Sequence, residues 1–188
     1  MIEQHYLDDC LVQLRKLKAQ ADAAIAQVSE DQLFAVLDPE ANSIAILMKH
    51  LAGNMRSRWT NFLTTDGEKA TRDRDAEFEA GEEDTRAGVI QMWTDGWSRL
   101  FQTVSTLTPD DLRKTVEIRG ESHSVVEAIN RQMTHYAAHV GQIVLLAKHY
   151  AGPSWRTLSI PRGKSREFEV AKSGRAYGLP PRGPERGA

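Results

Sequence analysis

Cysteine is nearly absent from this 188-residue sequence, in which Cys10 is the single example. One cysteine cannot form an intramolecular disulfide, and a zinc ribbon needs several, so both kinds of cross-linked small domain are excluded. Cys10 lies among apolar residues of a helical pattern, and nothing near it in the sequence would lower its pKa. We therefore expect a packed, unreactive thiol in a protein of the reducing cytoplasm.

Long apolar runs and a strong net charge are also missing. No segment approaches the roughly 20 apolar residues of a membrane span, and Glu3, Asp8 and Asp9 replace the apolar run of a signal peptide. We expect a cytoplasmic protein without a membrane partner. The formal net charge is −2, although residues 152–188 carry eight Lys/Arg against three Asp/Glu. This excess is interpreted first as a solvated tail and only second as a nucleic-acid arm, so no nucleic-acid partner is expected.

Helical periodicity dominates what remains. Apolar residues recur at helical spacing over residues 2–28, from Asn42 or Ser43 to about 63, over 85–107, and from a capping box at Ser124 and Glu127 to about 150. The pattern predicts an all-α fold in residues 1–152, followed by an ordered irregular extension over 153–170 and a tail of disordered composition over 171–188. A brief extended piece is expected at 115–118.

The segment between residues 64 and 84 has no helical period and is dense in charge. Two interpretations stay open: a solvated loop, or a connection that carries the chain the length of a helical bundle so that the flanking helices run parallel.

Two histidines, His135 and His139, are four residues apart in the last helical pattern. On a helix this spacing lets both rings reach one point, as in a metal chelate. Imidazole suits zinc, nickel, copper or ferrous iron, and a catalytic site typically has three protein ligands, so His50 on the second helix is the candidate third ligand. The alternative is a hydrogen-bonded or exposed pair. Asn54 and Gln142 are candidates to orient a ligand or to make interhelical hydrogen bonds.

Both histidines of the pair are predicted to flank the apolar stripe of their helix, together with Gln132 and Leu146, instead of occupying its centre. His50 has a similar relation to its own stripe. Two such flanks facing each other predict a half-buried groove at the edge of a bundle core. Because no P-loop, dinucleotide glycine motif or Ser/His/Asp spacing is present, any hydrolytic or transfer chemistry must depend on the metal.

Four helical patterns, with a lone histidine early in the second and His-x3-His in the fourth, resemble the DinB/YfiT-like superfamily of metalloenzymes. Segments 58–69 (RWTNFLTTDGEK) and 158–165 (LSIPRGKS) look like one uncharacterised bacterial subgroup of that superfamily. The resemblance covers residues 1 to about 170. It implies an up-down-down-up four-helix bundle with an irregular C-terminal tail, and a divalent zinc or nickel ion held by His50, His135 and His139. Activities in that superfamily include transfer of low-molecular-weight thiols and thiol-dependent isomerisation, and many members have no assigned reaction.

The resemblance therefore implies a metal-dependent transferase or hydrolase acting on a small-molecule substrate such as a low-molecular-weight thiol. The alternative is a non-catalytic, dimeric helical bundle in which the ion only ties two helices together. A homodimer is expected, because the superfamily commonly pairs its bundles and because segments 64–84 and 153–170 are long for idle connectors.

Overall fold

Four long helices make up most of the computed structural model, which describes residues 2–81 and 84–166. They are α1 (Ile2–Ile25), α3 (Ile44–Trp59), α4 (Arg86–Thr106) and α5 (Val125–Ala151). The shorter elements are α2 (Glu30–Phe34), the 3₁₀ turns η1 (Ala76–Phe78), η2 (Asp111–Arg113) and η3 (Gly152–Ser154), and the strands β1 (Thr115–Ile118) and β2 (Glu121–Ser124). The prediction of a mainly helical protein is confirmed.

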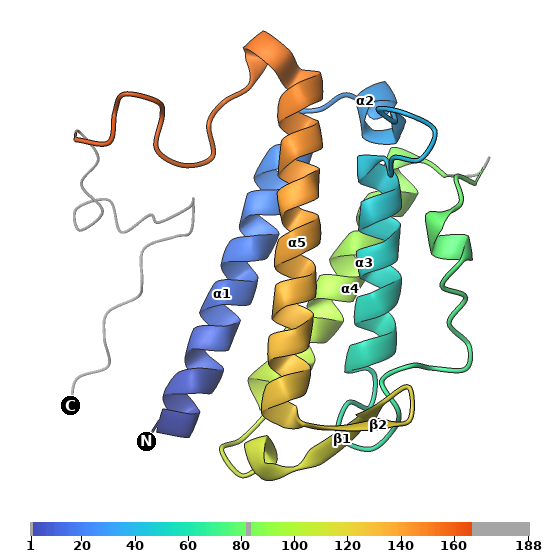
Figure 1. Cartoon of the computed structure of the whole chain (residues 1–188), viewed down its shortest axis with the longest axis vertical. Coiled ribbons are helices and arrows are strands. Elements are labelled where there is room, and N and C mark those ends of the chain that lie inside the picture. Colours follow the sequence, from blue (N-terminus) through green and yellow to red (C-terminus); the bar gives the residue numbers. More distant parts are fainter. Residues whose placement is uncertain (1, 82–83, 167–188) are drawn as a thin grey trace.

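The long helices lie side by side, with α3 packed along α4 and α1 along α5. Followed by colour in Figure 1, α3 and α4 both run downwards, whereas α1 and α5 run upwards. The connection between α3 and α4, for which the sequence allowed two interpretations, leads from the lower end of α3 to the upper end of α4. Of the two interpretations of residues 64–84, the structure therefore favours the one that spans the length of the helices.

Side-chain caps fix where the helices begin. Ser43 caps α3 by accepting from the Ile46 amide, and Ser124 with Glu127 forms the predicted capping box of α5. The second predicted helix is too long, because α3 ends at Trp59 and Asn61 has a φ of +50°. A left-handed residue cannot continue a right-handed helix. Helix α2 was not predicted, although Ser29 and Gln32 form a capping box that marks its start.

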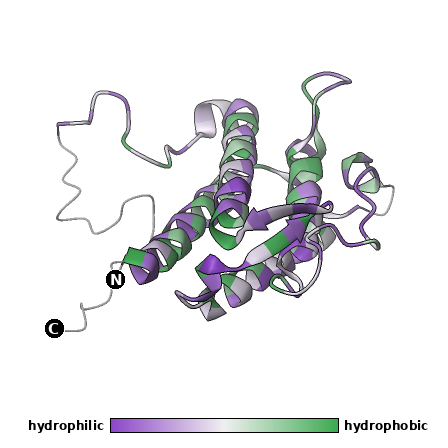
Figure 2. Ribbon diagram, turned by 60° about the horizontal axis from the view of Figure 1, so that its bottom comes forward, coloured by the Kyte–Doolittle hydropathy of each residue, from purple (hydrophilic) through white to green (hydrophobic). Residues whose placement is uncertain are grey.

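The core lies between the four long helices and contains the predicted apolar stripes. On α5, Ile129, Tyr136, Val140 and Ile143 are buried. Cys10 is a free, buried thiol whose burial raises its pKa, as the sequence predicted for an unreactive residue. Figure 2 shows apolar residues recurring between polar ones along the long helices, as expected for helices that bury one side. Within the described residues, none of the helices is long and apolar enough to cross a membrane.

The predicted extended piece at 115–118 is strand β1, which pairs antiparallel with β2. Arg119 and Gly120 form the two-residue turn with φ values of +59° and +73°, the double positive φ that tight hairpins require. Beyond α5, the Arg156 amide donates to Gln27 Oε1 at 2.7 Å, so the chain is held against the end of α1 there. Residues 171–188, predicted as a disordered tail, lie outside the described residues.

Candidate metal centre

The three predicted histidines meet between α3 and α5. One ring nitrogen from each of His50, His135 and His139 lies within 4.8 Å of the other two, and His50 Nε2 is 3.1 Å from His135 Nε2. His50 is buried, and the other two are half-buried. The structure thus brings together all three candidate ligands, which come from positions up to 89 residues apart in the sequence.

The outer nitrogen atoms of two rings are already engaged. His50 Nδ1 is 2.9 Å from Glu77 Oε2, and His139 Nδ1 is 2.7 Å from Gln142 Oε1. Since a carboxylate or amide oxygen accepts, each Nδ1 carries the proton and each Nε2 keeps its lone pair. A metal-bound histidine almost always donates its second N–H to such an oxygen.

The donor set and its spacing fit a zinc-type ion. Ligand nitrogens at 2.0–2.1 Å from a tetrahedral ion are about 3.3 Å apart, close to the spacing of the His50 and His135 nitrogens. The pKa of His135 is lowered to about 3, first by burial and then by the charges of His139 and His50, and burial also lowers the pKa of His139. Both rings are therefore neutral at physiological pH, as metal ligation requires.

Glu77 is a site residue that sequence reasoning missed. It belongs to η1, where Phe78 also packs on His50 with ring centroids 4.6 Å apart. Arg72 holds the Glu77 carboxylate in a fork, with Nε to Oε1 at 2.8 Å and Nη2 to Oε2 at 2.7 Å. Burial alone would raise the pKa of Glu77, but hydrogen bonds from His50 and Arg72 lower it below its ordinary value. Glu77 is therefore an ionised acceptor beside His50.

A chain of ion pairs anchors this carboxylate to the rest of the protein. Arg72 also pairs with Glu68 at 3.2 Å, and Glu68 pairs with Arg58 of α3 and Arg119 of the hairpin, both at 3.0 Å. Arg58 and the Arg72 side chain are buried. The charge-dense segment 64–84 is therefore fixed against α3 at these residues, and the prediction that it is simply a solvated loop is wrong.

Gly53 explains how the carboxylate comes so close to α3. A Cβ atom at this position would lie 2.1 Å from Glu77 Oε1, inside any permitted contact. Only glycine leaves that space open in the middle of a helix. Gly53 and His50 both lie on α3, so the absence of a side chain at Gly53 lets Glu77 reach His50.

Gln142 and Asn54, the two candidate orienting residues, have different hydrogen-bond partners. Gln142 contacts His139, as described above. Asn54 accepts a hydrogen bond from the Tyr136 hydroxyl at 3.0 Å, and Tyr136 in turn accepts from Trp59 Nε1 at 2.9 Å. Asn54 thus joins α3 to α5 through a buried interhelical hydrogen bond.

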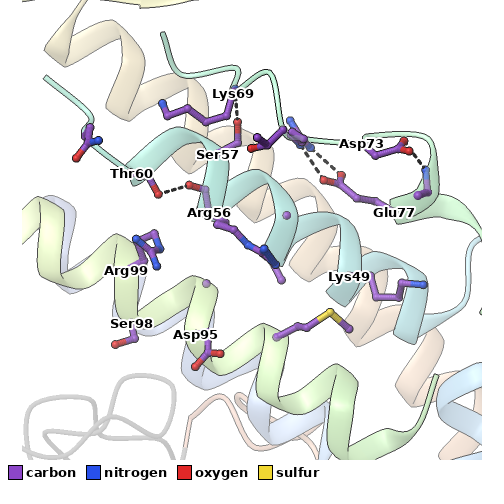
Figure 3. A pocket seen from close by; sticks show the side chains of 18 of the residues that line it. Lys49, Arg56, Ser57, Thr60, Lys69, Asp73, Glu77, Asp95, Ser98 and Arg99 are labelled. Carbon is purple, nitrogen blue, oxygen red and sulfur yellow. Dashed lines mark hydrogen bonds and ion pairs between the residues drawn. The ribbon is translucent and has the colours of Figure 1, made fainter. Parts of the chain in front are cut away.

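A pocket of about 1020 Å³ opens on another face of α3, between α3, α4 and residues 65–77. Figure 3 shows Arg56 of α3, Thr60 directly after that helix, and Asp95 and Arg99 of α4 around it. The three histidines do not line this pocket, whereas Glu77 does, so the carboxylate lies between the pocket and His50. The converging imidazoles, and not this pocket, form the candidate metal centre.

Comparison with known proteins gives a family without an assigned activity. Residues 1–164 match the model of the family described as "Protein of unknown function (DUF1572)". The search of curated proteins and the search of solved structures found no match. The matched range contains all four long helices and the three histidines. The chain therefore belongs to the DUF1572 family.

Proposed function

We propose that this protein is a metal-dependent enzyme of the DinB/YfiT-like kind, with an up-down-down-up helical bundle. In this proposal His50, His135 and His139 hold one divalent zinc or nickel ion, and the substrate is a small molecule such as a low-molecular-weight thiol. The observation that carries it is the convergence of three imidazoles, two of which have their outer nitrogens engaged by Glu77 and Gln142. Such outer contacts are typical of metal ligands.

The bound ion would supply Lewis acidity, which lowers the pKa of a coordinated water or thiol towards neutrality. The protein's own groups would prepare the site. Glu77 keeps the proton of His50 on Nδ1, and Gln142 does the same for His139, so each Nε2 lone pair would be available to the ion. Because His135 and His139 are only half-buried, a small substrate can approach from solvent.

A transfer assay tests the enzymatic part of the proposal. Zinc- or nickel-loaded protein should transfer a low-molecular-weight thiol to an electrophilic acceptor, or hydrolyse an activated ester, at a rate well above that of the metal-free protein. His135→Ala should reduce the rate at least tenfold, an order-of-magnitude expectation for losing one of three ligands. Equal rates for loaded and metal-free protein would remove the enzymatic proposal.

The same samples distinguish the alternative, a non-catalytic bundle in which the ion ties α3 to α5. A closed structural site would make the melting temperature fall sharply with a chelator while no transfer is observed. A catalytic site keeps an open position and tolerates loss of the ion.

We further propose that the chain forms a two-fold symmetric homodimer, the commonest soluble assembly. Light scattering at micromolar concentration should then report about twice the chain mass of 21.1 kDa. A single-chain mass, unchanged by added metal, would contradict the dimer. A dimer that survives truncation after residue 152 would put the interface on the helices and not on the C-terminal segment.

A further inference from the structure

Gln132 is a buried residue whose side-chain oxygen has no hydrogen-bond partner in the described part of the chain. Eight polar or charged residues are buried among those described: Ser43, His50, Asn54, Ser57, Arg58, Glu77, Asp111 and Gln132. Seven of these side chains make a hydrogen bond or ion pair within the described part of the chain. Gln132 is 4% exposed, and its Oε1 atom is fully buried and unpaired. Buried amide oxygens are nearly always satisfied, so this atom calls for an explanation.

The position of Gln132 on α5 offers an explanation for its unpaired oxygen. It precedes His135 by three residues and His139 by seven on α5. At 100° per residue, the three side chains leave the helix within about 60° of one another, so they share one face. Side chains on a helix lean towards its N-terminus, which brings the His135 ring over the turn that carries Gln132. The unpaired amide therefore lies on the same face of α5 as the two imidazoles, one turn nearer the N-terminus of the helix than His135.

A second unpaired atom belongs to the same neighbourhood. Arg58 Nε is buried without a partner, although the other two guanidinium nitrogens bond to Gly67 and Glu68. The charge of Arg58 is close enough to His135 to contribute to lowering the pKa of that ring. Among the described residues, Gln132 Oε1 is thus an unused acceptor and Arg58 Nε an unused donor.

We propose that the Gln132 carboxamide binds the ligand of the three-histidine site, with Oε1 accepting a hydrogen bond from an N–H or O–H group of that ligand. This rests on the proposed metal site. Because a carboxamide is uncharged, it suits a neutral donor such as the N–H of an amide and would not attract a charged group. The ligand class is therefore a small amide-containing molecule whose N–H group would donate to Gln132 Oε1.

Two matched probes test this in cobalt-loaded protein, where binding is followed through the cobalt absorption spectrum. Acetohydroxamate has an N–H beside its metal-binding oxygens, and N-methylacetohydroxamate lacks it. Gln132→Met should weaken acetohydroxamate binding about tenfold, the usual effect of losing one hydrogen bond, and leave N-methylacetohydroxamate binding unchanged. The exposed Gln102 of α4 provides the control, and Gln102→Met should change neither affinity.

Stability and cobalt content complete the test. Gln132→Met should keep its cobalt and melt at the same temperature as the wild type or higher, because a buried unpaired polar atom has been removed. An unchanged ratio of the two probe affinities in Gln132→Met overturns the proposal, as does a lowered melting temperature with that ratio unchanged, which indicates a structural role. If the wild type takes up no cobalt, the metal site itself fails, and the role of Gln132 fails with it.

Discussion

Replacing both His135 and His139 by alanine is expected to abolish specific metal binding while the helical fold is retained. The two rings supply two of the three ligands, and a single remaining imidazole is a weak ligand, so the affinity should fall by more than about 10³-fold. The fold should persist because both rings are half-buried at the edge of the core. Titration with zinc or nickel, monitored by calorimetry, measures the affinity, and circular dichroism measures the helix content.

The matched control for this experiment is His149→Ala. His149 is exposed on the same helix and contacts the neighbouring Tyr150 ring. It lies ten residues beyond His139, about 15 Å along the axis, which is too far to share an ion. The control should bind metal as the wild type does. Wild-type metal affinity in the double variant would exclude His135 and His139 as ligands.

Replacing Glu77 by alanine is expected to weaken both stability and metal binding. Arg72 would lose its bidentate partner in a buried setting, and breaking a buried pair on one side typically costs about 3–5 kcal/mol. Glu68 still faces Arg72, so we expect the lower end of that range. His50 would lose the acceptor that fixes its proton, which should reduce metal affinity about 10- to 100-fold. Urea denaturation and metal titration measure the two effects separately.

Gly53→Ala is expected to displace the Glu77 carboxylate without removing a charge. The new Cβ would require Glu77 Oε1 to move from its position beside α3, so metal affinity should fall about tenfold even though every ionisable group remains. Gly141→Ala is the matched control, because a Cβ at that position meets nothing within 4 Å. It should gain up to about 1 kcal/mol of stability through helix propensity and leave metal affinity unchanged. Equal metal affinities for Gly53→Ala and Gly141→Ala would show that the position of Glu77 does not matter to the site.

The helices and the histidines were predictable because both depend on local spacing. Apolar residues at helical intervals mark the helices, and the four-residue interval between His135 and His139 places both rings on one side. The position of Glu77 beside His50 could not be predicted from local spacing. It approaches His50 from 27 residues away, through a segment without periodicity, and its position is set by Arg72 and Gly53. A glycine in the middle of α3 was the one available signal that another group comes close there.

Asn54 and Gln142 also show that helical spacing alone does not identify the partner of a side chain. Both lie within a turn of a histidine in sequence, yet Gln142 contacts a ring while Asn54 bonds to Tyr136 on the opposite helix. Helical spacing gives the face of a residue, but the partner across the interface depends on how α3 and α5 pack. The same packing leaves Gln132 unpaired, which the sequence could only place near the histidines.

The metal content of the wild-type protein after reconstitution tests the proposed three-histidine metal site most directly. The full chain is incubated with excess zinc or nickel, unbound ions are removed on a desalting column, and metal per chain is measured by elemental analysis. Three convergent imidazoles predict about one equivalent. Less than about 0.2 equivalents for both ions would contradict the metal site, since a preformed three-histidine site should retain its ion through the column.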